Sequence, residues 1–144
     1  MAIGYNAPIS FGREGSAASL NCLNIDCSDS GDYSWTTGPL AEIDIRLPPA
    51  REDVVLAIDT GAYVREGNPP QQVSVYVGGA FVGFWRVTAY GTLTAHIPRQ
   101  LLTGRMTRLA LVIPNAVSPF ALGLGEDRRE LGLHLHSITF RLGQ

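Results

Sequence analysis

Apolar and polar residues alternate with a period of two along most of this chain. In AEIDIRL (41–47), Ile43, Ile45 and Leu47 alternate with charged residues, as in a strand with one buried face. DVVLAIDTGAYV (53–64) is mostly apolar, which is typical of a central strand. Further strands are predicted at 72–77, 80–89, 92–97, 107–113 and 131–140.

Proline and glycine stand between these runs, and Gly78-Gly79 suits the turn of a hairpin. IPRQLL (97–102) is predicted to form a single helical turn, and no other segment has a period of 3.6 residues. Residues 1–30 read as one irregular strand around SLNCLNI (19–25) and a long loop, packed on the rest. The pattern therefore predicts a single all-β domain, 1–144, built as an antiparallel β-sandwich, jelly-roll or barrel.

Composition narrows the classes of partner. The net charge of -2 argues against a nucleic-acid binder, and no apolar run approaches the roughly 18 residues of a membrane span. The first residues lack the basic and apolar regions of a secretory signal, so the chain is predicted to be soluble and cytoplasmic. Because thiols stay reduced in that compartment, Cys22 and Cys27 are predicted to be free, with a disulfide as the alternative.

A series of short motifs resembles a known family. Trp35-Thr36-Thr37-Gly38 precedes a strand, a VSVYVGG hairpin leads into FVGFWRV, and Ser118-Pro119 and Asp127-x-Arg129-x-Leu131-Gly132 follow. The series is similar to the jelly-roll, galactose-binding-like domains found with bacterial glycosyltransferases, although Gly78 stands where that family often has asparagine. The resemblance implies a non-catalytic carbohydrate-binding module in polysaccharide or surface-glycan biosynthesis, with a glycosyltransferase as candidate partner.

Sugar-binding sites combine an aromatic surface with planar polar groups, and the predicted ligand contacts follow that chemistry. Strand alternation exposes either Trp85 or Phe84, and an exposed Trp85 near Tyr90 would stack on a sugar. The opposite arrangement, with Trp85 in the core, stays open. A second aromatic segment holds Tyr33 and Trp35, and the resemblance implies a structural role for Trp35. The predicted ligand-binding residues are Trp85, Arg86, Tyr90, Asp127 and Arg129.

Asp127 and Arg129 have two interpretations. Arg129 can fork onto a carboxylate and fix the loop at 118–125, or the pair can hydrogen-bond a sugar. Three aspartates at intervals of three residues, Asp26, Asp29 and Asp32, suggest a calcium loop, against the alternative of a solvated turn.

His134 and His136 share one face of the last strand and lie within reach of a common metal or partner. Together with His96 they suggest a rival metalloenzyme. No catalytic motif is recognisable, which favours binding over catalysis. The other rival is an assembly domain that docks onto a glycosyltransferase or forms a homo-oligomer through apolar runs such as AFVGFW.

Overall fold

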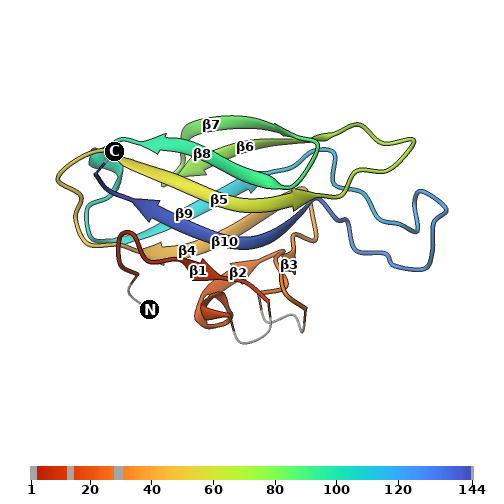
Figure 1. Cartoon of the computed structure of the whole chain (residues 1–144), viewed down its shortest axis with the longest axis horizontal. Coiled ribbons are helices and arrows are strands. Elements are labelled where there is room, and N and C mark those ends of the chain that lie inside the picture. The colour runs from red at the N-terminus through yellow and green to blue at the C-terminus, as the bar shows by residue number, and fades with distance from the viewer. Residues whose placement is uncertain (1–2, 13–14, 28–30, 144) are drawn as a thin grey trace.

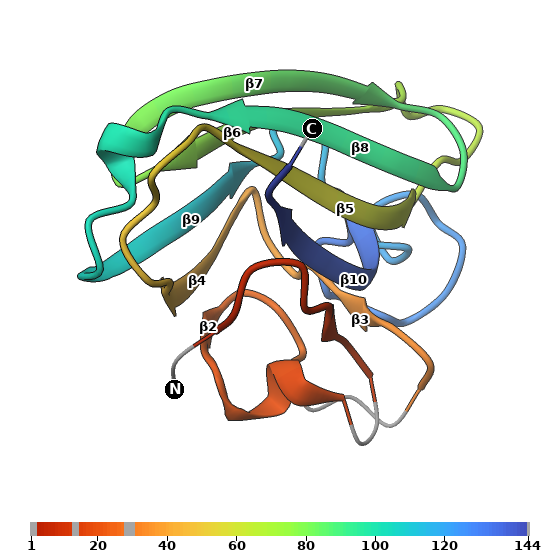
Figure 2. The ribbon, with the colours of Figure 1, turned by 60° about the vertical axis from the view of Figure 1, so that its left-hand side comes forward.

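The computed structural model describes residues 3–12, 15–27 and 31–143, which form a two-sheet antiparallel sandwich (Figures 1 and 2). Two short 3-10 helices, η1 (Ser16–Ser19) and η2 (Arg99–Leu101), accompany the strands. Within these described residues there is no α-helix, and no helix has the length and apolar character that a membrane crossing requires. The first sheet contains β1 (Ile9–Ser10), β10 (Leu133–Arg141), β5 (Val54–Ala62) and β8 (Gly91–Ile97), with β3 (Ser34–Trp35) also paired to β10. The second sheet runs β2 (Asn21–Leu23), β4 (Leu40–Arg46), β9 (Met106–Val112), β6 (Gln71–Val77) and β7 (Ala80–Val87).

The predicted strands are confirmed, and the apolar residues of each series supply its buried positions. Ile43 and Ile45 of β4 are buried against Leu133, Leu135 and other residues of the opposite sheet in one continuous core. β5 is flanked by β10 and β8 and is buried on both faces over much of its length, which accounts for its apolar run. The predicted helical turn is η2.

The hairpin between β6 and β7 turns at Gly78 and Gly79, as predicted. Their φ angles are +59° and +83°, the left-handed pair that a type I′ turn needs. The turn pairs Val77 with Ala80 and Tyr76 with Phe81, and a register shift beyond them places Ser74 opposite Phe84 and Val73 opposite Trp85.

Trp85 faces the core, so the prediction that it forms an exposed stacking surface is wrong. Its side chain is 9% exposed, and its indole Nε1 donates to the Thr94 carbonyl of β8 at 2.9 Å. Phe84 is 55% exposed on the outer face instead. A bulge opposite Val75 and Tyr76 and the pairing with buried Val73 decide which face is inside.

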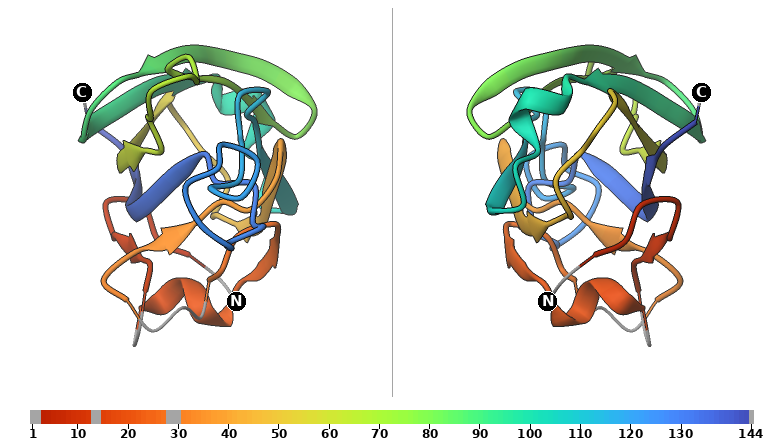
Figure 3. Two further views of the ribbon diagram at one scale, coloured as in Figure 1. Left: turned by 90° about the vertical axis from the view of Figure 1, so that its right-hand side faces the viewer. Right: turned by 90° about the vertical axis from the view of Figure 1, so that its left-hand side faces the viewer.

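The N-terminal segment folds against the edges of both sheets (Figure 3). The predicted strand around 19–25 is present as β2, and β1 precedes it. Cys22 and Cys27 form a disulfide, so the prediction of free thiols is wrong. Asn24 adopts φ +56°, and the Cys27 N–H donates to the Ile25 carbonyl at 2.8 Å, so the chain bends twice between the two cysteines, whose Cα atoms lie 6.5 Å apart.

Removal of the disulfide is expected to lower the free energy of unfolding by about 2 kcal/mol, because a cross-link between residues five apart closes only a short loop of the unfolded chain. The measurement is urea unfolding of the oxidised chain with and without dithiothreitol. The double variant Cys22→Ser/Cys27→Ser is the control, because its curve should not respond to the reductant. Coincident curves for the oxidised and reduced wild type would contradict the expectation.

Candidate functional site

Six aromatic side chains gather on the outer side of the first sheet, where β5 ends and β8 and β10 begin. Tyr33 packs on Trp35 with ring centroids 5.8 Å apart and on both histidines of β10, at 4.9 Å and 5.1 Å. Tyr90 packs edge-on to His136 at 4.9 Å. We call this set the aromatic cluster: Tyr33, Trp35, Tyr63, Tyr90, His134 and His136.

The two histidines touch through their ring nitrogens. His134 Nδ1 and His136 Nε2 are 3.0 Å apart, so one ring donates a hydrogen bond to the other. The predicted side-by-side placement is confirmed, and the pairing of β10 with β5 shifts register between Leu135 and Ser137. The His134 ring lies directly over Gly61 of β5, where a Cβ atom would be 2.0 Å from Cε1 and Nε2 of the ring.

Asp59 supplies the negative charge beside the cluster. Its two carboxylate oxygens accept hydrogen bonds from Thr92 at 2.6 Å and Ser137 at 3.0 Å. The bond from Thr92 is the largest cause that lowers the pKa of Asp59, with a smaller opposing effect from burial. Burial and, to a smaller extent, the His136 charge lower the pKa of His134, so this imidazole is neutral at neutral pH.

Arg129 connects the long loop before β10 to the segment before β3. Its guanidinium donates to both oxygens of Asp127, at 2.8–3.2 Å, and to Asp26 Oδ2 at 3.0 Å. The Asp26 backbone N–H donates in turn to the Trp35 carbonyl at 3.0 Å. The hydrogen bond from Arg129 lowers the pKa of Asp127. Arg129 thus forks onto a carboxylate, as the structural interpretation predicted, and it also connects Asp127 to the segment before β3; a sugar contact of the pair stays a prediction.

The structure brings together only some of the predicted ligand contacts. Tyr90 is 61% exposed and belongs to the aromatic cluster, whereas Arg86 is exposed on the outer face of the second sheet beside Phe84 and Trp85 is in the core. Asp59 was missed from the sequence. The sequence did contain a signal for Asp59, because it is the only charged residue in the apolar run of β5.

Two metal sites were predicted from the sequence, one at the three aspartates and one at the three histidines. Asp26 is occupied by Arg129, Asp32 is exposed, and Asp29 lies outside the described residues. His96 pairs with Val55, six residues along β5 from Gly61, so roughly 20 Å separate it from His134. The three histidines thus cannot share one ion. Among the described residues, no group of three histidine, cysteine, aspartate or glutamate side chains is arranged to hold a metal.

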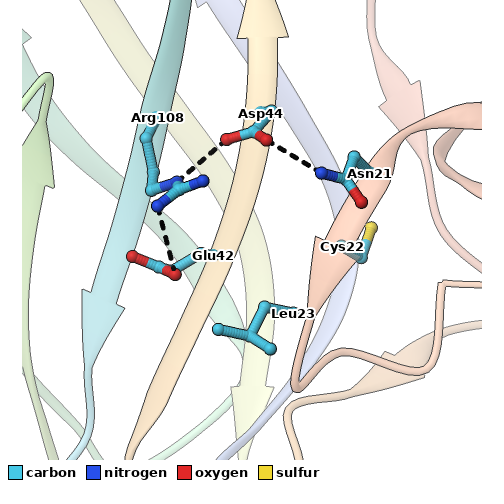
Figure 4. A pocket seen from close by; sticks show the side chains of 6 residues that line it. All are labelled: Asn21, Cys22, Leu23, Glu42, Asp44 and Arg108. Carbon is cyan, nitrogen blue, oxygen red and sulfur yellow. Dashed lines mark hydrogen bonds and ion pairs between the residues drawn. The ribbon is translucent and has the colours of Figure 1, made fainter.

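A polar groove of about 280 Å³ lies on the outer face of the second sheet (Figure 4). Its charged groups are paired with one another: Arg108 Nε bonds Asp44 at 2.9 Å, and Asn21 donates to the other oxygen of that carboxylate at 2.9 Å. No aromatic side chain is present among the described residues that line it, so a sugar ring would find no stacking surface there. The aromatic cluster is therefore the better candidate site. The groove is lined by Asn21, Cys22, Leu23, Glu42, Asp44 and Arg108.

Several solved structures with a similar architecture are carbohydrate-binding modules. The C-terminal CBM6 of LamC, a marine laminarinase from Zobellia galactanivorans, matches with a TM-score of 0.55 and 11% identity over 94% of this chain and 98% of its own. The CBM35 of Paenibacillus barcinonensis matches with a TM-score of 0.55 and 12% identity over 96% and 100%. A β-1,3-glucan-binding CBM6 from Bacillus halodurans matches with a TM-score of 0.52 and 12% identity over 99% and 100%.

The fold is that of a galactose-binding-like jelly roll. At such low identity, the likeness confirms the predicted fold class, and the function has to be inferred from the side chains of the candidate site. No protein-family model matches the chain, and no curated protein matches it significantly.

Proposed function

We propose that this chain is a non-catalytic carbohydrate-binding module whose ligand site is the aromatic cluster. The observation that carries the proposal is that Tyr33 and Tyr90, from segments far apart in the chain, both contact the His136 ring while Tyr90 remains largely exposed. Aromatic rings stack on the apolar faces of sugars, and rings held by different segments offer a surface broader than one residue can.

Polar groups beside the cluster suit the hydroxyl rim of a sugar. Asp59 is ionised and uses one hydrogen bond at each of its oxygens, which leaves acceptor capacity on both. The histidine ring nitrogens add donors and acceptors. A charged acceptor beside exposed rings gives orientation as well as affinity, because it prefers hydroxyls that lie near the plane of its carboxylate.

The related folds support the same class of ligand. One neighbour is described as β-1,3-glucan binding, and a CBM36, with a TM-score of 0.50 and 13% identity, is described in complex with calcium and xylotriose. A role in bacterial polysaccharide or surface-glycan biosynthesis, beside a glycosyltransferase, is the finer proposal and comes from the sequence resemblance. The cytoplasmic location stays a prediction, and the disulfide favours an oxidising compartment instead.

Tyr90→Ala is expected to weaken glycan binding about tenfold, the loss of one aromatic contact of roughly 1.4 kcal/mol. A glycan array on the purified chain identifies the ligand, and calorimetry with that ligand compares the variants. Phe81→Ala is the matched control, because Phe81 is equally exposed at 59% but lies on the second sheet. Equal losses in both variants, or none in Tyr90→Ala, would reject the aromatic cluster as the site.

A second candidate is self-association through the outer face of the second sheet. Phe81 and Phe84 of β7 are exposed at one edge of this sheet, and Phe81 packs on Tyr76 of the neighbouring β6 with ring centroids 5.7 Å apart. Light scattering of the purified chain distinguishes this oligomer from a monomeric module.

A further inference from the structure

We infer that His134 and His136 form a two-nitrogen chelating site for a divalent transition-metal ion, with Cu²⁺ and Ni²⁺ favoured over Zn²⁺. The two side chains belong to the proposed sugar site. Metal binding itself stands on their geometry alone, and only its use in sugar recognition rests on the proposed function.

The distance between the two ring nitrogens decides the preferred ion. Nitrogens 3.0 Å apart, each bound to a metal at about 2.1 Å, subtend an angle of about 90° at the ion. That is the angle between neighbouring ligands in square-planar or octahedral coordination, the geometries of Cu²⁺ and Ni²⁺. Tetrahedral Zn²⁺ needs its nitrogens about 3.4 Å apart and a larger rearrangement.

The rings are held in this arrangement before any metal arrives. Tyr33 contacts both imidazoles, Trp35 packs on His134 with ring centroids 5.1 Å apart, and Tyr90 packs on His136 with ring centroids 4.9 Å apart. In a neutral imidazole one nitrogen carries the proton and the other is free to ligate. The ring that donates the N–H···N bond therefore has to move its proton to its other nitrogen, so that both facing nitrogens present a lone pair to an ion beside the line that joins them. Little side-chain entropy remains to be lost on chelation.

The surroundings favour a cation and leave part of its coordination shell open. Asp59 lies close enough to His136 for their charges to interact, and its ionised carboxylate attracts a positive ion. Because the described residues offer no group of three ligands, two protein nitrogens leave the other positions to water. Hydroxyls of a bound sugar can replace that water, which would make the ion a bridge between the protein and its ligand.

Titration calorimetry with NiCl₂ on tag-free protein, without sugar, is the primary test. We expect one ion per chain, and at least about tenfold weaker binding in His134→Ala and in His136→Ala. His96→Ala is the matched control, because it removes the only other histidine of the chain from an exposed position on the same sheet face. Unchanged affinity in the first two variants, or an equal loss in the control, would overturn the inference.

Two additional measurements guard against misfolded variants and separate the two proposals. Electron paramagnetic resonance of the wild type with one equivalent of Cu²⁺ should show two coupled imidazole nitrogens, and a spectrum with none would overturn the inference without any variant. Glycan binding is then compared in Ni²⁺ and in EDTA. Sugar binding by a chain that takes up no metal rejects only the metal site, and nickel binding by a chain that binds no glycan rejects only the proposed function.

Discussion

Replacing Trp85 with alanine is expected to lower the free energy of unfolding by about 3–5 kcal/mol, the range for removal of a large buried aromatic side chain. The Trp85 indole fills the space between the edge strands of the two sheets, and its Nε1 hydrogen bond to Thr94 fastens β7 to β8. The truncation loses both the buried area and this bond, and it leaves the Thr94 carbonyl without its donor. The measurement is urea or thermal unfolding followed by circular dichroism.

Phe84→Ala is the control one residue away on the same strand. Because its ring is mostly exposed, the change in the free energy of unfolding is expected to stay within about 0.5 kcal/mol. Comparing the two variants shows how much the buried face and the exposed face of β7 each contribute to the free energy of unfolding. A stable Trp85→Ala protein with weakened glycan binding would restore Trp85 to the ligand site and contradict the burial described above.

Gly61→Ala is expected to dismantle the aromatic cluster while the sandwich still folds. The new methyl group would lie 2.0 Å from two atoms of the His134 ring, so the ring must leave its place. Gly61 is not among the glycines with positive φ, so the effect is steric. Displacement of His134 breaks its bond to His136 and its contacts with Tyr33 and Trp35. We expect Ni²⁺ affinity to fall about a hundredfold, as for loss of a metal-orienting contact, with glycan affinity falling alongside it.

Gly91→Ala is the matched control, since Gly91 lies on the neighbouring strand and a Cβ there would meet no described atom within 4 Å. Calorimetry with nickel and with the glycan compares the two variants, and thermal unfolding verifies that both fold. Wild-type affinities in Gly61→Ala would show that the position of His134 over Gly61 is unimportant to the site.

The location of the strands was readable from the sequence because it depends on local pattern. Period-two alternation needs only neighbouring residues, and the Gly78-Gly79 turn needs only two residues free to take positive φ. The Asp127–Arg129 bond was also foreseeable, since the two residues are two apart. Its second partner, Asp26, is 103 residues away from Arg129, and no local rule could have paired them.

The sequence by itself therefore determined the fold class, the strand positions and the placement of His134 beside His136. Only the tertiary structure decided which face of β7 is buried. Alternation alone is compatible with either face being inside, and the bulge and the pairing of Trp85 with Val73 determine which one is. The tertiary structure also decided the disulfide, through the bends between Cys22 and Cys27, and the contacts of Tyr33 and Tyr90 with the histidines. These features depend on contacts between segments that are far apart in the sequence, and such contacts form only when the two sheets pack together.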